Sequence, residues 1–528
     1  MLVYGDHHDE AEPRDALAAV EQRVVRGDRC GALIEGGRLA QALLDAEQEE
    51  IGCDDATPLS RACMALLLGL ARGDAPADLA ASFEDVAALI PGGRVFLRVP
   101  EGYAFYAVFP QLYAMAAQRA PRGLQALGIR SIGTSLAAAV AAASAGPAPL
   151  SVRPRGHPHA RVLSLSERLK QRLDPRGQYA IVDEGPGLSG TSFIAVVDEL
   201  LARGVAADRI HLFPSHAGPP GPQAPARVRA LWPTLRKHVV AFDLLLRELP
   251  LWVADLTGPL QEPLADLSGG AWRALLGGDI PPSNVRQERR KYLLRSADGT
   301  FLLKFAGLGA VGEEVARRAR AVAAAGFGPE VLGLRNGFLV QRWVERAEGP
   351  PPGAAEVAAY LAFRSRALPA RPRSGASPSK LLEMAEHNSG RARPDLRRRL
   401  DDVIREQMPV EIDGRLHPWE WLRDSSGRLL KTDAADHCRA HDLVGCQDAA
   451  WDIAGACIEL GLDETALVGR FRASGGRGAS PEVLAFLRPC YLAFQLGAHR
   501  LAAESLPGEA ARLHRAADRY ARLLSAAS

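Results

Sequence analysis

The chain has 528 residues, more than one hydrophobic core usually supports, so several domains are expected. A formal net charge of +2 argues against a surface dedicated to nucleic acid, and no apolar run reaches the roughly 18 residues of a membrane-spanning helix. The seven cysteines form no Cys-x-x-Cys pair. We therefore expect a cytoplasmic protein with reduced thiols that binds small molecules rather than nucleic acid or a membrane. Assembly into a homo-oligomer stays open.

The first 250 residues predict helices followed by alternating strands and helices. Apolar residues recur at helical spacing over 16–20, 39–44 and 62–70. Short apolar runs at 95–99, 127–131, 179–182 and 209–213 predict strands, and 103–117 predicts one apolar helix. Strands that alternate with helices predict a mainly parallel sheet whose two faces are covered.

The rest of the chain predicts an antiparallel hairpin and then mostly helices. Runs at 291–295 and 300–305 flank Ala297-Asp298-Gly299, a strong hairpin signal. A helix is expected over 313–325, a strand over 338–343, a Pro- and Ser-rich connection over 368–380, and helices from 381 onward. The predicted domains are a helical region at 1–92, a sheet domain at 93–258, a small lobe at 268–365 and a helical lobe at 366–528.

The stretch IVDEGPGLSGTSF at 181–193 predicts a sugar-phosphate site. Asp183 and Glu184 end a strand and can accept hydrogen bonds from neighbouring sugar hydroxyls. The glycines of the following turn let backbone N–H groups approach phosphate oxygens, and the helix that starts there adds its positive end. The residues that would contribute amides or hydroxyls are Gly187, Ser189, Gly190, Thr191 and Ser192. A glycine-rich connection without a ligand is the alternative.

This stretch resembles the PRPP-binding signature of type I phosphoribosyltransferases, although four residues rather than three separate the acids from Ser189-Gly190. The turn after 127–131 resembles the family's pyrophosphate turn, and an arginine-bearing loop lies between the two turns. The resemblance implies that these turn and loop residues contact pyrophosphate: Gly133, Thr134, Ser135, Arg153, Arg155 and Arg161. It also implies a phosphoribosyltransferase enzyme that uses PRPP and Mg²⁺, with Asp183 and Glu184 orienting the ribose.

A second resemblance, to aminoglycoside-phosphotransferase-like kinases, covers roughly residues 285–500. Lys304 on a strand and Glu314 on a helix resemble the pair that positions ATP phosphates, although an ordinary surface ion pair is the alternative. DGRLHPWEWL at 413–422 lines up with the family's catalytic loop HGDLHPGNIL. LLKTD at 429–433 lines up with the strand that carries the metal-binding acid, and GCQDAAWDIA at 445–454 resembles GDPAWDLA.

The departures from this kinase pattern fall on catalytic positions. Arg415 occupies the place of the catalytic Asp, and a guanidinium cannot accept a proton. Glu420 occupies the place of the Mg²⁺-binding Asn, so Glu420 and Asp433 would hold the metal. We expect ATP to bind, whereas ordinary kinase activity is in doubt.

The expected fold is α/β, with a parallel-sheet phosphoribosyltransferase-like core and a helical N-terminal addition. A bilobal kinase-like domain follows, with a small α+β lobe and a mostly α large lobe. The expected function is phosphoribosyl transfer on a nitrogenous base, coupled to a nucleotide-binding kinase-like domain. The alternatives are a non-catalytic sensor of nucleotide or PRPP, and a small-molecule kinase that uses the first half as a scaffold.

Overall fold

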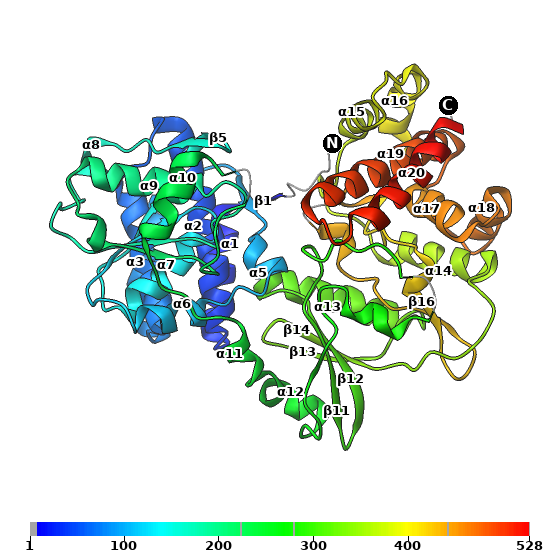
Figure 1. The fold of residues 1–528 in the computed structure, drawn as a ribbon, viewed down its shortest axis with the longest axis horizontal. Helices are drawn as coiled ribbons and strands as arrows, with labels where there is room; N and C mark the ends of the chain where they lie inside the picture. The colour runs from blue at the N-terminus through cyan, green and yellow to red at the C-terminus, as the bar shows by residue number, and fades with distance from the viewer. Residues whose placement is uncertain (1–7, 222–223, 278–279, 441–442, 527–528) are drawn as a thin grey trace. The chain divides into compact units, whose positions relative to one another are not determined.

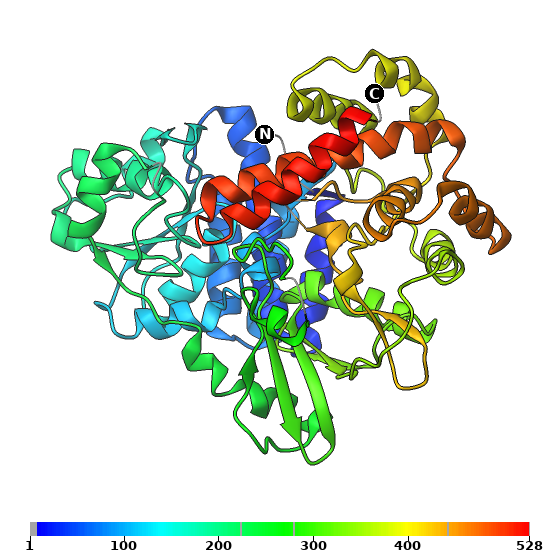
Figure 2. The ribbon, with the colours of Figure 1, turned by 45° about the vertical axis from the view of Figure 1, so that its right-hand side comes forward.

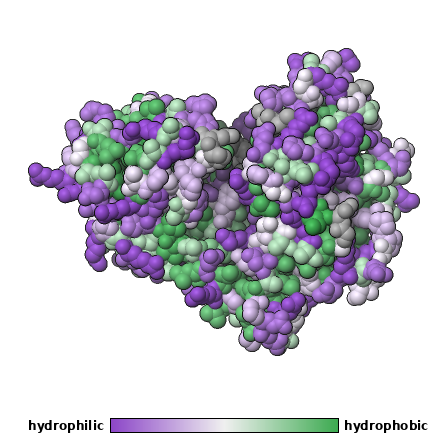
Figure 3. Space-filling model, in the orientation of Figure 1, coloured by the Kyte–Doolittle hydropathy of each residue, from purple (hydrophilic) through white to green (hydrophobic). Residues whose placement is uncertain are grey.

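Two units of the chain make up the structure (Figure 1). The computed structural model describes residues 8–221, 224–277, 280–440 and 443–526. The N-terminal unit comprises residues 8–249 and 308–310, and the C-terminal unit comprises 250–307 and the residues from 311 onward. Among the described helices, none is long and apolar enough to cross a membrane. On the face shown in Figure 3, hydrophilic and hydrophobic residues are interspersed on both units.

Four helices lie near the start of the N-terminal unit, and the first three contain the runs at 16–20, 39–44 and 62–70 whose apolar spacing predicts helices. They are α1 (Pro13–Val25), α2 (Arg29–Ile51), α3 (Pro58–Arg72) and α4 (Pro76–Leu89). Three of them begin with proline, which suits the first helical turn because the N–H that it lacks has no partner there. Their apolar faces form one core that includes Leu33, Leu43, Leu67 and Phe83.

A parallel five-stranded sheet follows, which confirms the predicted sheet. Its strand order is β4-β3-β7-β8-β9, and every adjacent pair is parallel. The strands are β3 (Gln125–Ile129), β4 (Leu150–Val152), β7 (Tyr179–Val182), β8 (Ile210–Phe213) and β9 (Arg236–Lys237). Leu127 and Ile181 share a core with helix α9 (Thr191–Ala202). On the alternate positions, Gly128 lies against α7 (Gly133–Ala143), so helices cover both faces.

The remaining elements of this unit are short. Two antiparallel pairs join β1 (His8–Ala11) to β2 (Val95–Arg98), and β5 (Arg155–His157) to β6 (Ala160–Val162). The short helices are α5 (Glu101–Phe105), α6 (Pro110–Ala117), α8 (Glu167–Lys170), α10 (Ala226–Leu231) and α11 (Asp243–Leu246). The single helix predicted over 103–117 is therefore wrong. Ala107 takes a positive φ of 52° and Pro110 starts a new helix, so the segment is broken in two.

The C-terminal unit begins with an antiparallel five-stranded sheet of order β10-β11-β12-β14-β13. Helix α12 (Leu249–Thr257) leads into it, and α13 (Gly309–Ala324) separates its third and fourth strands. The strands are β10 (Ala265–Asp266), β11 (Lys291–Ser296), β12 (Gly299–Phe305), β13 (Val331–Arg335) and β14 (Phe338–Arg342). Strands β11 and β12 form the hairpin that Ala297-Asp298-Gly299 predicts.

Helices dominate the rest of this unit. They are α14 (Ala354–Ala367), α15 (Pro378–Ser389), α16 (Pro394–Glu406), α17 (Ala450–Leu460), α18 (Glu464–Ala473), α19 (Pro481–Ser505) and α20 (Ala510–Ala526). Four short strands form two pairs: β15 (Pro409–Val410) with β18 (Gln447–Asp448), and β16 (Trp421–Arg423) with β17 (Leu429–Lys431). The long helices α19 and α20 lie side by side in both ribbon views (Figures 1 and 2).

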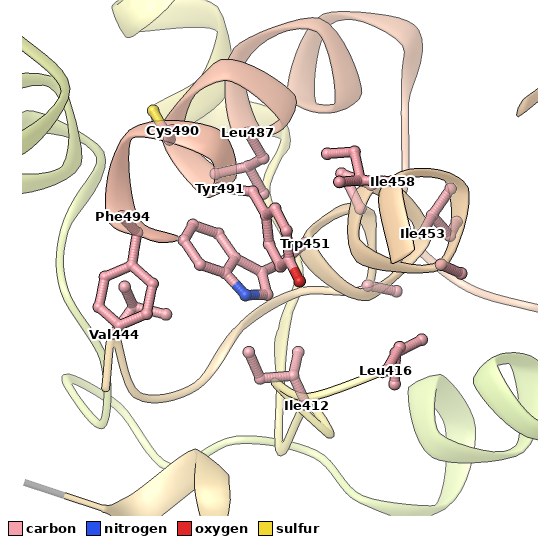
Figure 4. Close-up of a cluster of buried hydrophobic side chains, with 14 of the residues drawn as sticks. Ile412, Leu416, Val444, Trp451, Ile453, Ile458, Leu487, Cys490, Tyr491 and Phe494 are labelled. Atoms are coloured by element: carbon pink, nitrogen blue, oxygen red, sulfur yellow. The ribbon is translucent and has the colours of Figure 1, made fainter. Parts of the chain in front are cut away.

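The core of this helical part supports the segment that contains Asp413. Trp451 of α17 packs edge-on against Tyr491 and Phe494 of α19 (Figure 4). Ile412 and Leu416 belong to the same apolar cluster, so the segment between them is anchored on both sides. Close packing of this kind fixes the backbone of an otherwise irregular loop.

Candidate active site

Lys304 lies at the centre of an acidic cluster in the C-terminal unit. It is on β12, which pairs with β11 on one side and β14 on the other. Its ammonium forms an ion pair with Asp433, just beyond β17, and lies 3.2 Å from a carboxylate oxygen of Asp436. Arg289 donates to the other oxygen of Asp436, at 3.1 Å. The side chain of Asp433 is 25 % exposed and that of Lys304 is 9 %, so the cluster opens to solvent at Asp433.

The charges in this cluster keep both acids ionised. Burial alone would raise the pKa of Asp433, but the attraction of Lys304 outweighs it and holds the pKa well below its usual range. The same balance between burial and Lys304 lowers the pKa of Asp436 to about 2. At neutral pH the cluster therefore presents two carboxylates that a cation can bind.

Lys304 is not paired with Glu314, contrary to the predicted pairing. Glu314 is on α13, where a helix was expected, but its carboxylate lies 2.5 Å from a guanidinium nitrogen of Arg371 and 3.8 Å from one of Arg318. Arg318 follows one helical turn later, so it competes for the same carboxylate. Asp433 and Asp436 take the role of counter-ion to Lys304.

The loop that begins at Asp413 is held by buried charges. The carboxylate of Asp452, on α17, accepts hydrogen bonds from the N–H groups of Asp413 and Gly414, at 2.7 and 2.9 Å. Asp413 is itself fully buried, and its carboxylate accepts a hydrogen bond from the Tyr360 hydroxyl. Burial and the neighbouring Asp413 raise the pKa of Asp452 to about 6. The segment at 413–422, which resembles a catalytic loop, and the segment at 445–454, which resembles GDPAWDLA, therefore meet.

Glu420 forms an ion pair with a lysine. It ends a short 3-10 helix at Pro418–Glu420, and its carboxylate lies 2.6 Å from the ammonium of Lys431 on β17. The Lys431 side chain is 0 % exposed, and it also lies 2.6 Å from the backbone oxygen of Asp433 and 3.1 Å from a carboxylate oxygen of Asp413. Glu420, expected to hold a metal with Asp433, thus has an internal cation as its partner.

Two sets of side chains in the described part of the chain could hold a metal ion. One set is Asp413, Glu420 and His437, and the other is Asp433, Asp436 and His437, each with its ligand atoms within 4.8 Å of one another. Mg²⁺ prefers oxygen ligands and usually takes one or two carboxylates together with phosphate oxygens. Asp433 and Asp436 fit this requirement, because they are ionised and Asp433 is accessible to solvent.

Sequence reasoning missed the roles of Asp436 and Lys431, and it did not assign His437 to this site. His437 contacts the backbone oxygen of Asp413 through Nδ1, at 3.0 Å, while its Nε2 faces Asp433 and Asp436 at 3.7 and 3.9 Å. One signal was available: a lysine in the apolar strand Leu429-Leu430-Lys431 requires a buried acid as its partner. Nothing local to Asp436 or His437 distinguishes them from loop residues.

In the N-terminal unit, Asp183 and Glu184 lie at the carboxyl end of β7, as expected. Several polar groups of the turn that follows have partners within the protein. The hydroxyls of Ser189 and Thr191 each donate to the backbone oxygen of Pro158, at 2.6 Å. The N–H of Gly190 donates to the oxygen of Pro186 at 2.8 Å. Gly187 is exposed and Ser192 is half-buried on the first turn of α9.

Most of the other residues assigned to this half have hydrogen-bond partners within the unit. Arg153 donates two hydrogen bonds to Asp45 of α2, at 2.5 and 2.6 Å, and Arg155 donates to Gln48 at 2.8 Å. Arg161 is on β6. The hydroxyls at the start of α7 have partners too: Thr134 contacts Ser151 at 2.9 Å, and Ser135 contacts Tyr103 at 2.7 Å.

Gly133, at the start of α7, has a packing role. A Cβ added there would lie 2.4 Å from the backbone oxygen of Val182 on β7. A contact that short has no room for a side chain, so a glycine is needed for α7 to approach β7. This requirement accounts for the glycine whether or not an anion binds.

Comparisons with solved structures find partial likenesses to phosphotransferases and a kinase. The chain is similar to "Macrolide 2'-phosphotransferase type I", with 16% identity over 53% of this chain and 98% of that chain, and a TM-score of 0.33. Choline kinase LicA from Streptococcus pneumoniae has 15% identity over 44% and 89%, and a TM-score of 0.30. A spectinomycin phosphotransferase, solved with ADP and spectinomycin, has 10% identity over 53% and 98%, and a TM-score of 0.35.

These likenesses are to kinase-type phosphotransferases and cover about half of this chain. At such identities and TM-scores they assign no function by themselves. No protein-family model matches the sequence, and the comparison with curated proteins finds no match.

The prediction of a phosphoribosyltransferase enzyme is wrong. The solved structures named above are kinases and phosphotransferases, and they give no support to phosphoribosyl transfer or to PRPP as a co-substrate. The N-terminal unit has a parallel sheet, but a phosphoribosyltransferase core is not shown. In the turn after β7, the hydroxyls of Ser189 and Thr191 and the N–H of Gly190 donate to backbone oxygens of Pro158 and Pro186, so these three donors are already used within the protein.

Proposed function

We propose that the C-terminal unit is a kinase-type phosphotransferase that binds ATP with Mg²⁺ and transfers the γ-phosphate to a small-molecule acceptor. The observation that carries this proposal is the position of Lys304 on a central strand, facing Asp433 and Asp436 beyond β17. Kinases use a strand lysine to bind ATP phosphates and a nearby acid to bind Mg²⁺. When bound, the metal would neutralise negative charge on the phosphates.

Two features favour a pre-organised site. Asp452 fixes the backbone at Asp413 and Gly414, as described above. The guanidinium of Arg364 donates to the backbone oxygens of Glu411, Ile412 and Ala434, which ties the loop before Asp413 to the segment after Asp433. Groups that are held in place before substrate binds need little reorganisation during the reaction.

Phosphoryl transfer does not require a carboxylate at position 415, where this chain has an arginine. General-base help contributes about 100- to 10,000-fold to a rate. Phosphoryl transfer depends mainly on positioning and charge stabilisation, which Lys304 and Asp433 would supply. We therefore propose a transferase whose acceptor loses its proton without a carboxylate base at position 415.

The test is formation of ADP by the full chain from ATP and Mg²⁺, alone and with a panel of small alcohols and amines as acceptors. We expect acceptor-dependent ADP formation that falls at least about 100-fold in Lys304→Met and Asp433→Asn, the scale of losing an electrostatic group in the transition state. Lys380→Met, an exposed lysine at the start of α15, should match the wild type. If the wild type forms no ADP above background and binds no ATP, the proposal fails.

A further inference from the structure

Asp413, Glu420 and His437 could together hold a cation, but the ammonium of Lys431 already lies beside the two carboxylates. Their ligand atoms lie within 4.8 Å of one another. The ammonium of Lys431 lies 2.6 Å from the carboxylate of Glu420 and 3.1 Å from that of Asp413. The ammonium thus forms an ion pair with each acid and donates a hydrogen bond to Glu420.

Lys431 cannot leave this position easily. Its side chain is 0 % exposed, and its ammonium also donates to the backbone oxygen of Asp433 at 2.6 Å. The ring of Trp421, on the paired strand β16, lies 5.9 Å from the ammonium. An ammonium has three donors, and here three oxygens lie within 3.1 Å of the nitrogen. Removal of Lys431 would leave Asp413 and Glu420 as buried carboxylates without their nearest cation.

Kinases commonly hold two Mg²⁺ ions, one on the acid after the strand and one on the asparagine of the catalytic loop. Glu420 lines up with that asparagine, and Asp433 with that acid. We infer that Lys431 replaces the second metal ion, so that the site takes one divalent cation per chain, at Asp433 and Asp436. This inference rests on the proposed function, since it concerns the same nucleotide site.

The most exposed acid of the set around Lys431 is Glu420, at 11 %, whereas Asp433 of the other set is 25 % exposed. Asp433 is 25 % exposed and can receive a metal from solvent with the nucleotide. Asp413 is 0 % exposed, and its remaining oxygen accepts from the Tyr360 hydroxyl.

The experiment counts Mn²⁺ bound per chain by electron paramagnetic resonance, on the full chain, with and without ADP. Mn²⁺ shares the preference of Mg²⁺ for oxygen ligands and is directly visible. We expect one Mn²⁺ per wild-type chain, at least a tenfold loss of its affinity in Asp433→Asn, and two Mn²⁺ in Lys431→Met. The double variant Glu420→Gln/Lys431→Met should return to one.

Two Mn²⁺ per wild-type chain would overturn the inference, and this count needs no variant to fold. One Mn²⁺ in a folded Lys431→Met chain would overturn it as well. If Lys431→Met unfolds, the wild-type count decides. The count also separates the two proposals: ADP binding with two Mn²⁺ leaves the proposed function intact, whereas no ADP binding at all removes the proposed function.

Discussion

The carboxylate of Asp452 accepts a hydrogen bond from the backbone N–H of Asp413, at 2.7 Å. The two residues are 39 positions apart, and their contact joins α17 to the loop that leads to Glu420. Because the same carboxylate also takes the N–H of Gly414, one side chain satisfies two backbone donors that the loop itself cannot pair.

Asp452→Ala should destabilise the C-terminal unit through these two donors. Each buried N–H left without an acceptor costs about 1–3 kcal/mol of unfolding free energy. Chemical denaturation of the full chain measures the change. Asp463→Ala, which removes only the exposed N-cap of α18, should cost about 1 kcal/mol. Equal losses in the two variants would show that Asp452 does not hold the loop.

Arg364→Met should lower the free energy of unfolding more than Asp452→Ala does. Arg364→Lys should not restore the lost stability. The guanidinium of Arg364 donates to three backbone oxygens and to the Tyr360 hydroxyl. A lysine has a single nitrogen, which cannot span these acceptors. Breaking a buried charged network costs about 3–5 kcal/mol, which equilibrium unfolding would detect. A lysine variant as stable as the wild type would contradict the assigned role.

The pH dependence of stability should report on Asp183 and Glu184 in the N-terminal unit. Burial raises the pKa of Asp183 to about 7, and burial together with the neighbouring Asp183 raises that of Glu184 to about 8. The folded chain therefore holds protons that the unfolded chain has already released above pH of about 4. The free energy of unfolding should therefore fall as the pH rises from about 4 to about 8, because the folded chain gives up these protons only near the top of that range.

Melting temperatures between pH 5 and 9 test this dependence. The double variant Asp183→Asn/Glu184→Gln should lose less stability than the wild type as the pH rises from 5 to 8, because it has no proton to release at these positions. Asp208→Asn changes an exposed acid in the same unit and should keep the wild-type slope. Parallel slopes for the wild type and the double variant would mean that the two acids titrate normally.

Much of the fold could be predicted from local patterns. The apolar run at 179–182 coincides with β7, and the turn at Ala297-Asp298-Gly299 forms the expected hairpin. Both follow from hydrophobic periodicity and turn chemistry, which act over a few residues. The prediction of one helix over 103–117 was wrong because the apolar residues continue across the break between Ala107 and Pro110.

The site was harder to predict because its pairings are set by tertiary structure. Lys304 could be placed on a strand, but its partners Asp433 and Asp436 lie 129 and 132 residues away. The motif at 181–193 had suitable residues for phosphate, yet Ser189 and Thr191 bond to Pro158, about thirty positions earlier. Which polar groups the fold itself satisfies is not visible in a short stretch of sequence.

Calorimetric titration of ATP with Mg²⁺ into the full chain tests the central claim most directly. We predict saturable binding of one ATP per chain in the wild type and in Lys380→Met. In Lys304→Met the affinity should fall at least about tenfold, which corresponds to 1.4 kcal/mol, because the ammonium would no longer contact the phosphates. Equal affinity in the wild type and Lys304→Met would contradict the claim that Lys304, beside Asp433, marks a nucleotide site.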